Sequence, residues 1–290
     1  MTRPNLIDQA AVLPERDLLL LDLLLQHRFL TRRHIQTLYF SAHHDPHSGN
    51  LTATRTPRAA QRRLQLLRRR GLLVRRYLAG PDGRRDPEPY FCLTADGAGL
   101  ACARAELTAA ERRKHASGAL ANPLFVRHAL AAAELHCALA TAARAQHDHE
   151  CRPQWWRGED ATAALFNDRG VKVLLRPDGY TRYRAGDDIH HLLTEIDLGT
   201  MPLPRLRSKL ELYRAYARSR AWQERYPVFP KLLLLTTAER RISRLLEQLG
   251  SLRELVLLAS THQQVHLQGP LASIWRQPGR PGLRPLLEPG

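Results

Sequence analysis

The chain has 290 residues and carries 44 lysine and arginine side chains against 28 aspartate and glutamate side chains, a formal net charge of +16. This length allows two modest hydrophobic cores, and such a basic excess favours a polyanion, either nucleic acid or an anionic membrane surface. The leucine-rich run at residues 18–25 contains Asp22 and is far shorter than the ~20 residues of a membrane-spanning helix. The amino terminus does not resemble a secretory signal, so we expect a cytoplasmic protein with no membrane partner.

Several common kinds of site find no support in the sequence. The four cysteines, Cys92, Cys102, Cys137 and Cys151, form no CxxC pair, which argues against a cysteine-based zinc site and favours buried free thiols. Neither a GxxxxGK[ST] phosphate-binding loop nor a GxSxG nucleophile elbow is present. An ATP-driven motor and a serine hydrolase are therefore unsupported.

The amino-terminal region is predicted to contain three helices, at residues 15–27, 32–40 and 57–70. Thr31 is a suitable N-cap for the second helix. The third opens with Thr56-Pro57, an N-cap followed by proline at the first helical position, and it stops at Gly71. The short connection between the first two helices is typical of a helix-turn-helix.

Two strands, residues 72–77 and 90–93, follow these helices. The loop between them contains Pro-Asp-Gly, a strong turn signal, and the ribbon would form a wing. Arg84 and Arg85 lie near its tip, where they would contact phosphate or enter a minor groove. The region at residues 1–100 is therefore predicted to be a winged helix-turn-helix domain.

The third helix has an apolar side and a polar, mostly cationic side. Its apolar side, Ala60, Leu64 and Leu67, recurs at helical spacing and should face the core. The opposite side is a stripe formed by Arg58, Gln61, Arg62, Gln65 and Arg69. Such a stripe suits the major groove of double-stranded DNA, where arginine pairs with guanine and glutamine with adenine. The alternatives are a charged face that is merely solvated, a protein-binding winged helix and an RNA partner.

A linker is predicted at residues 101–121, then a second domain over residues 122–268 and a proline-rich tail over residues 269–290, anchored by Trp275. The predicted elements of the second domain, apart from its central hairpin and the helix that follows, are a helix from residue 123 to 143, a strand at 154–159, an apolar strand at 229–235, a helix at 238–249 and an apolar strand at 255–259. On the helix at 238–249, Arg240, Arg241 and Arg244 are expected to be exposed. Strand, helix and strand after an antiparallel hairpin predict a mixed α/β sheet.

The centre of the second domain is a predicted hairpin of residues 171–184 and 189–199, turning at Gly186-Asp187. Symmetric pairing about this turn places Asp178 opposite Glu195. Asp197 shares the face of Glu195, because side chains two apart on a strand point the same way. Three carboxylates should therefore converge. They would be either solvated charges or a site where Asp178 and Glu195 hold Mg²⁺ or Mn²⁺.

A helix begins at Leu203, and Leu206, Leu210 and Tyr213 mark its apolar stripe. Lys209 borders this stripe. A helix packed on the sheet would bring Lys209 toward the carboxylates, where its ammonium would offset their charge and orient an attacking water. The alternative is a lysine that faces solvent.

These residues resemble a known family of phosphodiesterases. Pro177-Asp178, then Glu195-x-Asp197, then a helix with Lys209 are similar to the PD-(D/E)xK, or restriction-endonuclease-like, motif. More narrowly, PDGY, TEIDLGT and KLELY resemble the replication-relaxation proteins of plasmids and other mobile elements, which join such a domain to an amino-terminal winged helix.

The resemblance implies a DNA-binding protein of replication or mobilisation, with a Mg²⁺-dependent nickase or endonuclease site at Asp178, Glu195, Asp197 and Lys209. The chain departs from the broad motif, because Asp197 stands where the usual lysine would be. Activity would then depend on Lys209 replacing that lysine from the helix. The rival reading is a non-catalytic regulator whose decayed nuclease-like domain serves as a homodimerisation or DNA-clamping module.

Overall fold

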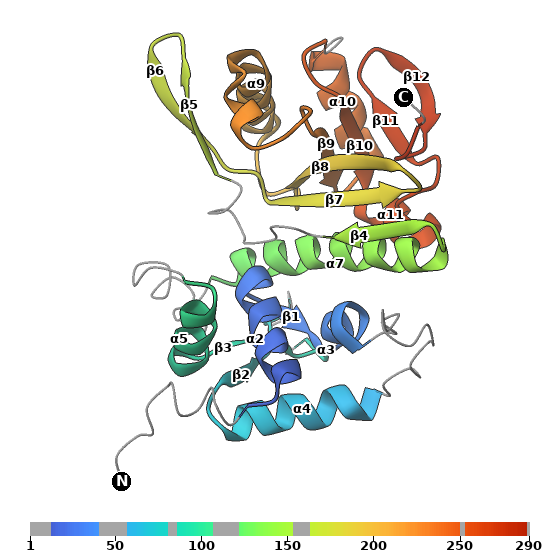
Figure 1. Ribbon diagram of the computed structural model, residues 1–290. Coiled ribbons are helices and arrows are strands. Elements are labelled where there is room, and N and C mark those ends of the chain that lie inside the picture. The colour runs from blue at the N-terminus through green and yellow to red at the C-terminus, as the bar shows by residue number, and fades with distance from the viewer. Residues whose placement is uncertain are drawn as a thin grey trace. The chain divides into compact units, whose positions relative to one another are not determined.

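The computed structural model describes residues 13–40, 57–80, 86–106, 122–152, 163–249 and 253–288. The chain divides into two compact units, Met1–Ala133 and Glu134–Gly290. Helix α7 (Pro123–Ala145) begins in the first unit and ends in the second (Figure 1). Helices and a mixed sheet confirm the predicted α+β class. The predicted domain boundaries and the winged-helix and nuclease-like assignments stay predictions.

The first unit contains four α-helices among its described residues, one of them continued by a π-helix, and a three-stranded sheet. These elements are α2 (Glu15–His27), β1 (Leu30–Thr31), α3 (Arg32–Ile35), the π-helix η1 (Gln36–Phe40), α4 (Pro57–Arg69), β2 (Leu73–Arg76), β3 (Tyr90–Leu93) and α5 (Ala95–Arg104). The strands are ordered β1-β3-β2, and both pairings are antiparallel.

The first unit agrees closely with the predicted helices. Helix α2 has the predicted bounds, and Thr31 caps α3 by accepting a hydrogen bond from the His34 N–H at 3.2 Å. Helix α4 ends at Arg69, one residue before the predicted end, and Gly71 lies just beyond it with a φ of 74°. The second predicted helix differs, because its last five residues form a π-helix. Strand β1 was not predicted, since two residues carry no detectable alternation.

The second unit is built on a seven-stranded sheet. Its elements are β4 (His149–Arg152), β5 (Ala164–Asp168), β6 (Val171–Leu175), β7 (Gly179–Ala185), β8 (Asp188–Ile196), α9 (Leu203–Ser219), the 3-10 helix η3 (Ala221–Glu224), β9 (Lys231–Thr236), α10 (Glu239–Leu249), β10 (Leu257–Thr261), α11 (His262–Gln268), β11 (Trp275–Gln277) and β12 (Arg280–Arg284). The large sheet has the order β12-β11-β10-β9-β8-β7-β4, while β5 and β6 pair only with each other. Strands β8, β9 and β10 are parallel, and the flanking pairings are antiparallel, as a mixed sheet requires.

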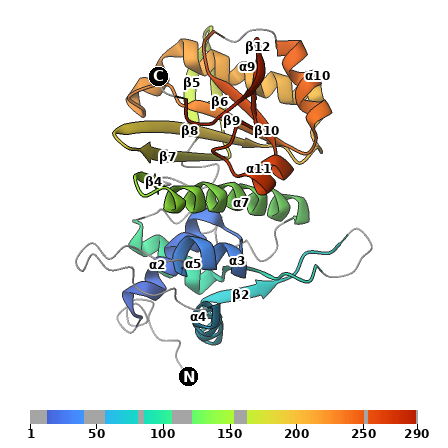
Figure 2. The same cartoon turned by 90° about the vertical axis from the view of Figure 1, so that its right-hand side faces the viewer.

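Helices α9 and α10 cover one face of the large sheet (Figures 1 and 2). The core on this face joins Leu210 and Tyr213 of α9 and Ile242 of α10 to Leu193 and Leu234 of the sheet. The apolar run of β9 is buried as predicted, because a central parallel strand is covered on both faces. No helix in the described part of the chain combines the length and apolar character needed to cross a lipid bilayer.

The central hairpin has the predicted register and turn. Gly179 pairs with Thr194 and Ala185 with Asp188, so the turn is Gly186-Asp187. Gly186 has a φ of 58°, which glycine adopts without a steric penalty. The first predicted run is wrong in one respect: residues 171–184 are two strands, because β6 leaves the large sheet to pair with β5.

The carboxyl-terminal residues add two strands to the edge of the large sheet rather than trailing from it. Strand β11 pairs with β10, and β12 pairs with β11. Trp275 is fully buried, as expected of an anchor, and its indole N–H donates to the Pro270 carbonyl at 2.8 Å. The predicted strand at residues 154–159 lies outside the described residues.

Candidate functional site

Asp178 and Glu195 lie opposite each other where β7 meets β8. The Asp178 N–H donates to the Thr194 carbonyl at 2.9 Å, which extends the ladder by one residue beyond β7. Asp178 Oδ2 also accepts from the Ile196 N–H at 2.7 Å, so this carboxylate is held against the backbone of β8. Asp178 is 7% exposed and Glu195 is 2% exposed. They are therefore not the solvated surface charges of the alternative interpretation.

Helix α9 brings a cation to these carboxylates. Lys209 Nζ lies 2.5 Å from Glu195 Oε2 and 3.7 Å from Asp178 Oδ1. Tyr213, one helical turn later, donates its hydroxyl to Glu195 Oε1. A role for Tyr213 at the carboxylates was not predicted, although its spacing from Lys209 places both side chains on the same side of α9. The cluster of Asp178, Glu195, Lys209 and Tyr213 is called the carboxylate cluster below.

The electrostatics of the carboxylate cluster are dominated by burial. Burial and the neighbouring charge of Asp178 raise the pKa of Glu195 to about 8, although Lys209 and the Tyr213 hydroxyl act in the opposite direction. Burial also raises the pKa of Tyr213 well above its usual value, and the Glu195 charge adds to this shift. One ammonium therefore faces two carboxyl groups, and the raised pKa of Glu195 lets it hold a proton near neutral pH.

Asp197 does not join the carboxylate cluster. It accepts from the Thr236 hydroxyl at 2.8 Å and pairs with the Arg241 guanidinium, whose second contact with it is 3.1 Å. Both partners lie on the β9 and α10 side of β8, whereas Asp178 approaches from β7. Strand alternation predicts on which face of the sheet a side chain lies, but not toward which neighbouring strand it points. The expected convergence of three carboxylates is therefore wrong.

The predicted exposure of Arg241 is also wrong. The residue was expected to be exposed, but its side chain is 16% exposed and additionally donates to the Met201 carbonyl.

Among the described residues, no group of three histidine, cysteine, aspartate or glutamate side chains is placed to hold a metal ion. Asp178 and Glu195 are two carboxylates, and Mg²⁺ usually takes one or two while keeping several waters. Their donor set is thus compatible with Mg²⁺ or Mn²⁺.

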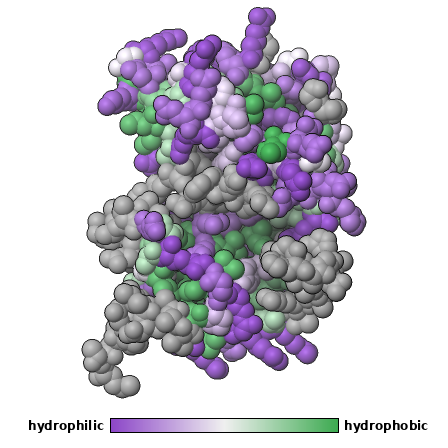
Figure 3. Space-filling model, viewed as in Figure 1, coloured by the Kyte–Doolittle hydropathy of each residue, from purple (hydrophilic) through white to green (hydrophobic). Residues whose placement is uncertain are grey.

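The polar stripe of α4 faces solvent. Its five residues Arg58, Gln61, Arg62, Gln65 and Arg69 are all exposed, while Ala60, Leu64 and Leu67 are buried, as the helical spacing predicts. Hydrophilic side chains project along the lower edge of Figure 3, where Figure 1 places α4. Arg84 and Arg85 lie outside the described residues.

A buried ion pair holds α4 to α2. Asp17 is 1% exposed, and both of its oxygens accept from Arg63, with a distance of 2.8 Å from Nε to Oδ1. Asp17 lies in the first turn of α2, and its partner is 46 residues away in the chain. This pair fixes how α4 presents its outer face.

The arrangement was compared with known proteins. The model of the replication-relaxation family matches residues 21–232, which is more than half of the chain and includes both α4 and the carboxylate cluster. Searches of curated proteins and of solved structures gave no match. The length of the family match is decisive, and the chain belongs to the replication-relaxation family.

Proposed function

We propose that this protein binds double-stranded DNA in a sequence-directed way and acts in the replication or mobilisation of a plasmid or other mobile element. Its first unit would be a winged helix-turn-helix, with α4 in the major groove and the ribbon of β2 and β3 as the wing. The observation that carries the proposal is α4, whose core side is apolar and whose outer side exposes three arginines and two glutamines. Membership of the replication-relaxation family supports the role in replication or mobilisation.

Binding to duplex DNA tests this function directly. Fluorescence anisotropy with labelled duplexes should give a dissociation constant that rises when Arg62 and Arg69 are both replaced by alanine. The expected increase is about tenfold or more, because each arginine contributes a phosphate or base contact. Arg280→Ala, an exposed arginine of the second unit, is the matched control and should bind like the wild type. Tighter binding to duplex RNA than to duplex DNA would contradict the proposal.

A second candidate function is Mg²⁺-dependent hydrolysis of one phosphodiester, favoured by the position of Lys209. Asp178 and Glu195 would hold the metal, which would supply an activated water and offset charge developing on the phosphate. Lys209 stands within reach of both carboxylates from α9 and would orient that water. It would replace the lysine that Asp197 displaces from the family motif.

Nicking of supercoiled plasmid with Mg²⁺ or Mn²⁺ tests the second function. Asp178→Asn and Lys209→Met should each lower the nicking rate by at least ~100-fold, since the first removes a metal ligand and the second removes the group that orients the attacking water. Glu247→Gln replaces an exposed carboxylate on α10 and should nick at the wild-type rate. Equal nicking by Asp178→Asn would assign the activity to a contaminant. If neither the wild type nor any variant nicks the plasmid while DNA binding is intact, the result would favour a non-catalytic regulator.

A further inference from the structure

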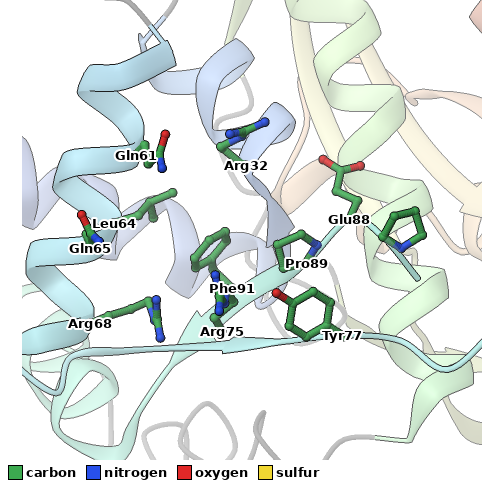
Figure 4. Close-up of a pocket in the computed structure, with 11 residues that line it drawn as sticks. Arg32, Gln61, Leu64, Gln65, Arg68, Arg75, Tyr77, Glu88, Pro89 and Phe91 are labelled. Atoms are coloured by element: carbon green, nitrogen blue, oxygen red, sulfur yellow. The ribbon is translucent and has the colours of Figure 1, made fainter. Parts of the chain in front are cut away.

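A cavity of about 540 Å³ opens between α4 and the ribbon of β2 and β3, within the first unit (Figure 4). Its volume lies within the ~300–1,000 Å³ range that is usual for small-ligand sites. The eleven lining residues are Arg32, Gln61, Leu64, Gln65, Arg68, Arg75, Tyr77, Pro87, Glu88, Pro89 and Phe91. A convex surface would be enough to contact a DNA backbone, so the hollow offers room for a ligand beyond that contact.

The walls of the cavity follow from two repeating patterns. On α4, Gln61, Leu64, Gln65 and Arg68 recur at offsets of three, four and seven, which places them on one side of the helix. On the ribbon, Arg75 is paired with Phe91, so both project from the same face. Tyr77 and Pro89 continue that face two residues further on.

The chemistry of the walls is both aromatic and cationic. The Arg75 guanidinium lies 5.5 Å from the centre of the Tyr77 ring, so a cation and a π-face form one wall. Phe91 and Leu64 are buried and form an apolar floor. Arg32 and Arg68 add two more guanidinium groups, and Glu88 is the carboxylate among the lining residues. A planar ring that carries a phosphate matches this combination.

We propose that this cavity binds one unpaired nucleotide of a DNA strand whose adjoining duplex lies on α4. The base would stack on Tyr77 and Arg75, the amides of Gln61 and Gln65 would pair with its edge, and Arg32 and Arg68 would meet the phosphates. A base inside a duplex cannot enter, because its faces are covered by its neighbours. The inference rests on the proposed duplex binding and adds a preference for duplexes that contain an unpaired base.

The test compares a duplex carrying one unpaired adenine with the same duplex fully paired. The wild-type protein should bind the bulged duplex about tenfold more tightly, since stacking of one base is worth ~1–3 kcal/mol. Tyr77→Ala should lose this preference, and Tyr77→Phe should keep it because the ring remains. Arg62→Ala is the matched control: Arg62 is exposed on α4 and does not line the cavity, so the variant should weaken binding to both duplexes by the same factor.

Two further arms separate the possible outcomes. With 2-aminopurine at the unpaired position, binding should change its fluorescence in the wild type but not in Tyr77→Ala. Calorimetry with deoxyadenosine monophosphate tests whether a free nucleotide enters the same cavity. Binding to the wild type that is lost in Tyr77→Ala would support a nucleotide site at this cavity. Equal affinity for both duplexes, without nucleotide binding, would overturn the inference and leave duplex binding standing. Failure to bind either duplex would instead refute the proposed function.

Discussion

Lys209 contacts the buried Glu195, with 2.5 Å between Nζ and Oε2, and the same ammonium, whose side chain is 25% exposed, lies 3.7 Å from Asp178. Removing one member of a buried pair is costly because the other charge is left uncompensated, whereas removing both members together is often tolerated. The pair is therefore open to a test of stability that does not depend on catalysis.

Above pH 8, where Glu195 is ionised, replacement of Lys209 by methionine should lower the free energy of unfolding by ~3–5 kcal/mol, because two buried carboxylates lose their ammonium. The double variant Lys209→Met with Glu195→Gln should recover most of that loss. Urea titrations followed by circular dichroism measure both effects. Lys172→Met, an exposed lysine on β6, is the control and should change stability little. Equal losses in the single and double variants would show that Lys209 and Glu195 are not energetically coupled.

The raised pKa of Glu195 predicts that stability falls as the pH rises. Between pH 4.5 and about 8 the folded state keeps a proton that the unfolded chain has released. The free energy of unfolding should then decrease with pH by up to ~1.4 kcal/mol per pH unit. The Glu195→Gln variant has no titrating group at this position. The stability of the wild type should therefore fall relative to that of the variant as the pH rises from 4.5 to about 8. Measurements with EDTA exclude bound cations, and a difference that does not vary with pH would contradict the prediction.

The sequence predicts the hairpin well because its information is local. A Gly-Asp turn and symmetric pairing determine which residues stand opposite each other, so Asp178 and Glu195 could be placed together in advance. The side chain of Asp197 could not be placed in this way. Strand alternation assigns the Asp197 side chain to a face of the sheet. Its partner Arg241 is 44 residues away in the chain, so only the packing of α10 on the sheet determines that Asp197 turns toward this helix.

Other features were missed for similar reasons. The helical spacing on α4 correctly separates core from surface, yet it does not reveal that Gln61 and Gln65 border a cavity with Tyr77 and Arg75. That cavity depends on the angle at which the ribbon leaves α4, which no local pattern encodes. Arg63 could equally have been read as part of the cationic side of α4, and its partner Asp17 is apparent only after folding.

The Asp17–Arg63 pair predicts that α4 depends on α2 for its stability. Asp17→Asn keeps the shape of the side chain but leaves the Arg63 guanidinium without its buried counter-charge, so we expect a loss on the order of 3 kcal/mol. Glu15→Gln is the matched control in the same turn of α2, because its pair with Arg104 is exposed and worth only ~0–1 kcal/mol. Thermal unfolding should separate the two variants clearly. Equal melting temperatures would contradict a structural role for the buried pair.

The stripe of α4 predicts a graded dependence of DNA binding on salt. Each phosphate contact that a cation makes releases counterions, so the logarithm of the binding constant falls linearly with the logarithm of the salt concentration. Replacing Arg62 by alanine should reduce the magnitude of that slope by about 1 if it contacts phosphate.

Gln65→Ala separates base recognition from charge. It carries no charge, so the slope should be unchanged, while the discrimination between target and altered sites should fall by a factor corresponding to ~1–3 kcal/mol. Anisotropy titrations over a series of salt concentrations, with both duplexes, measure the two quantities separately. A slope that Arg62→Ala leaves unaltered, together with unchanged discrimination in Gln65→Ala, would place the DNA on a surface other than α4.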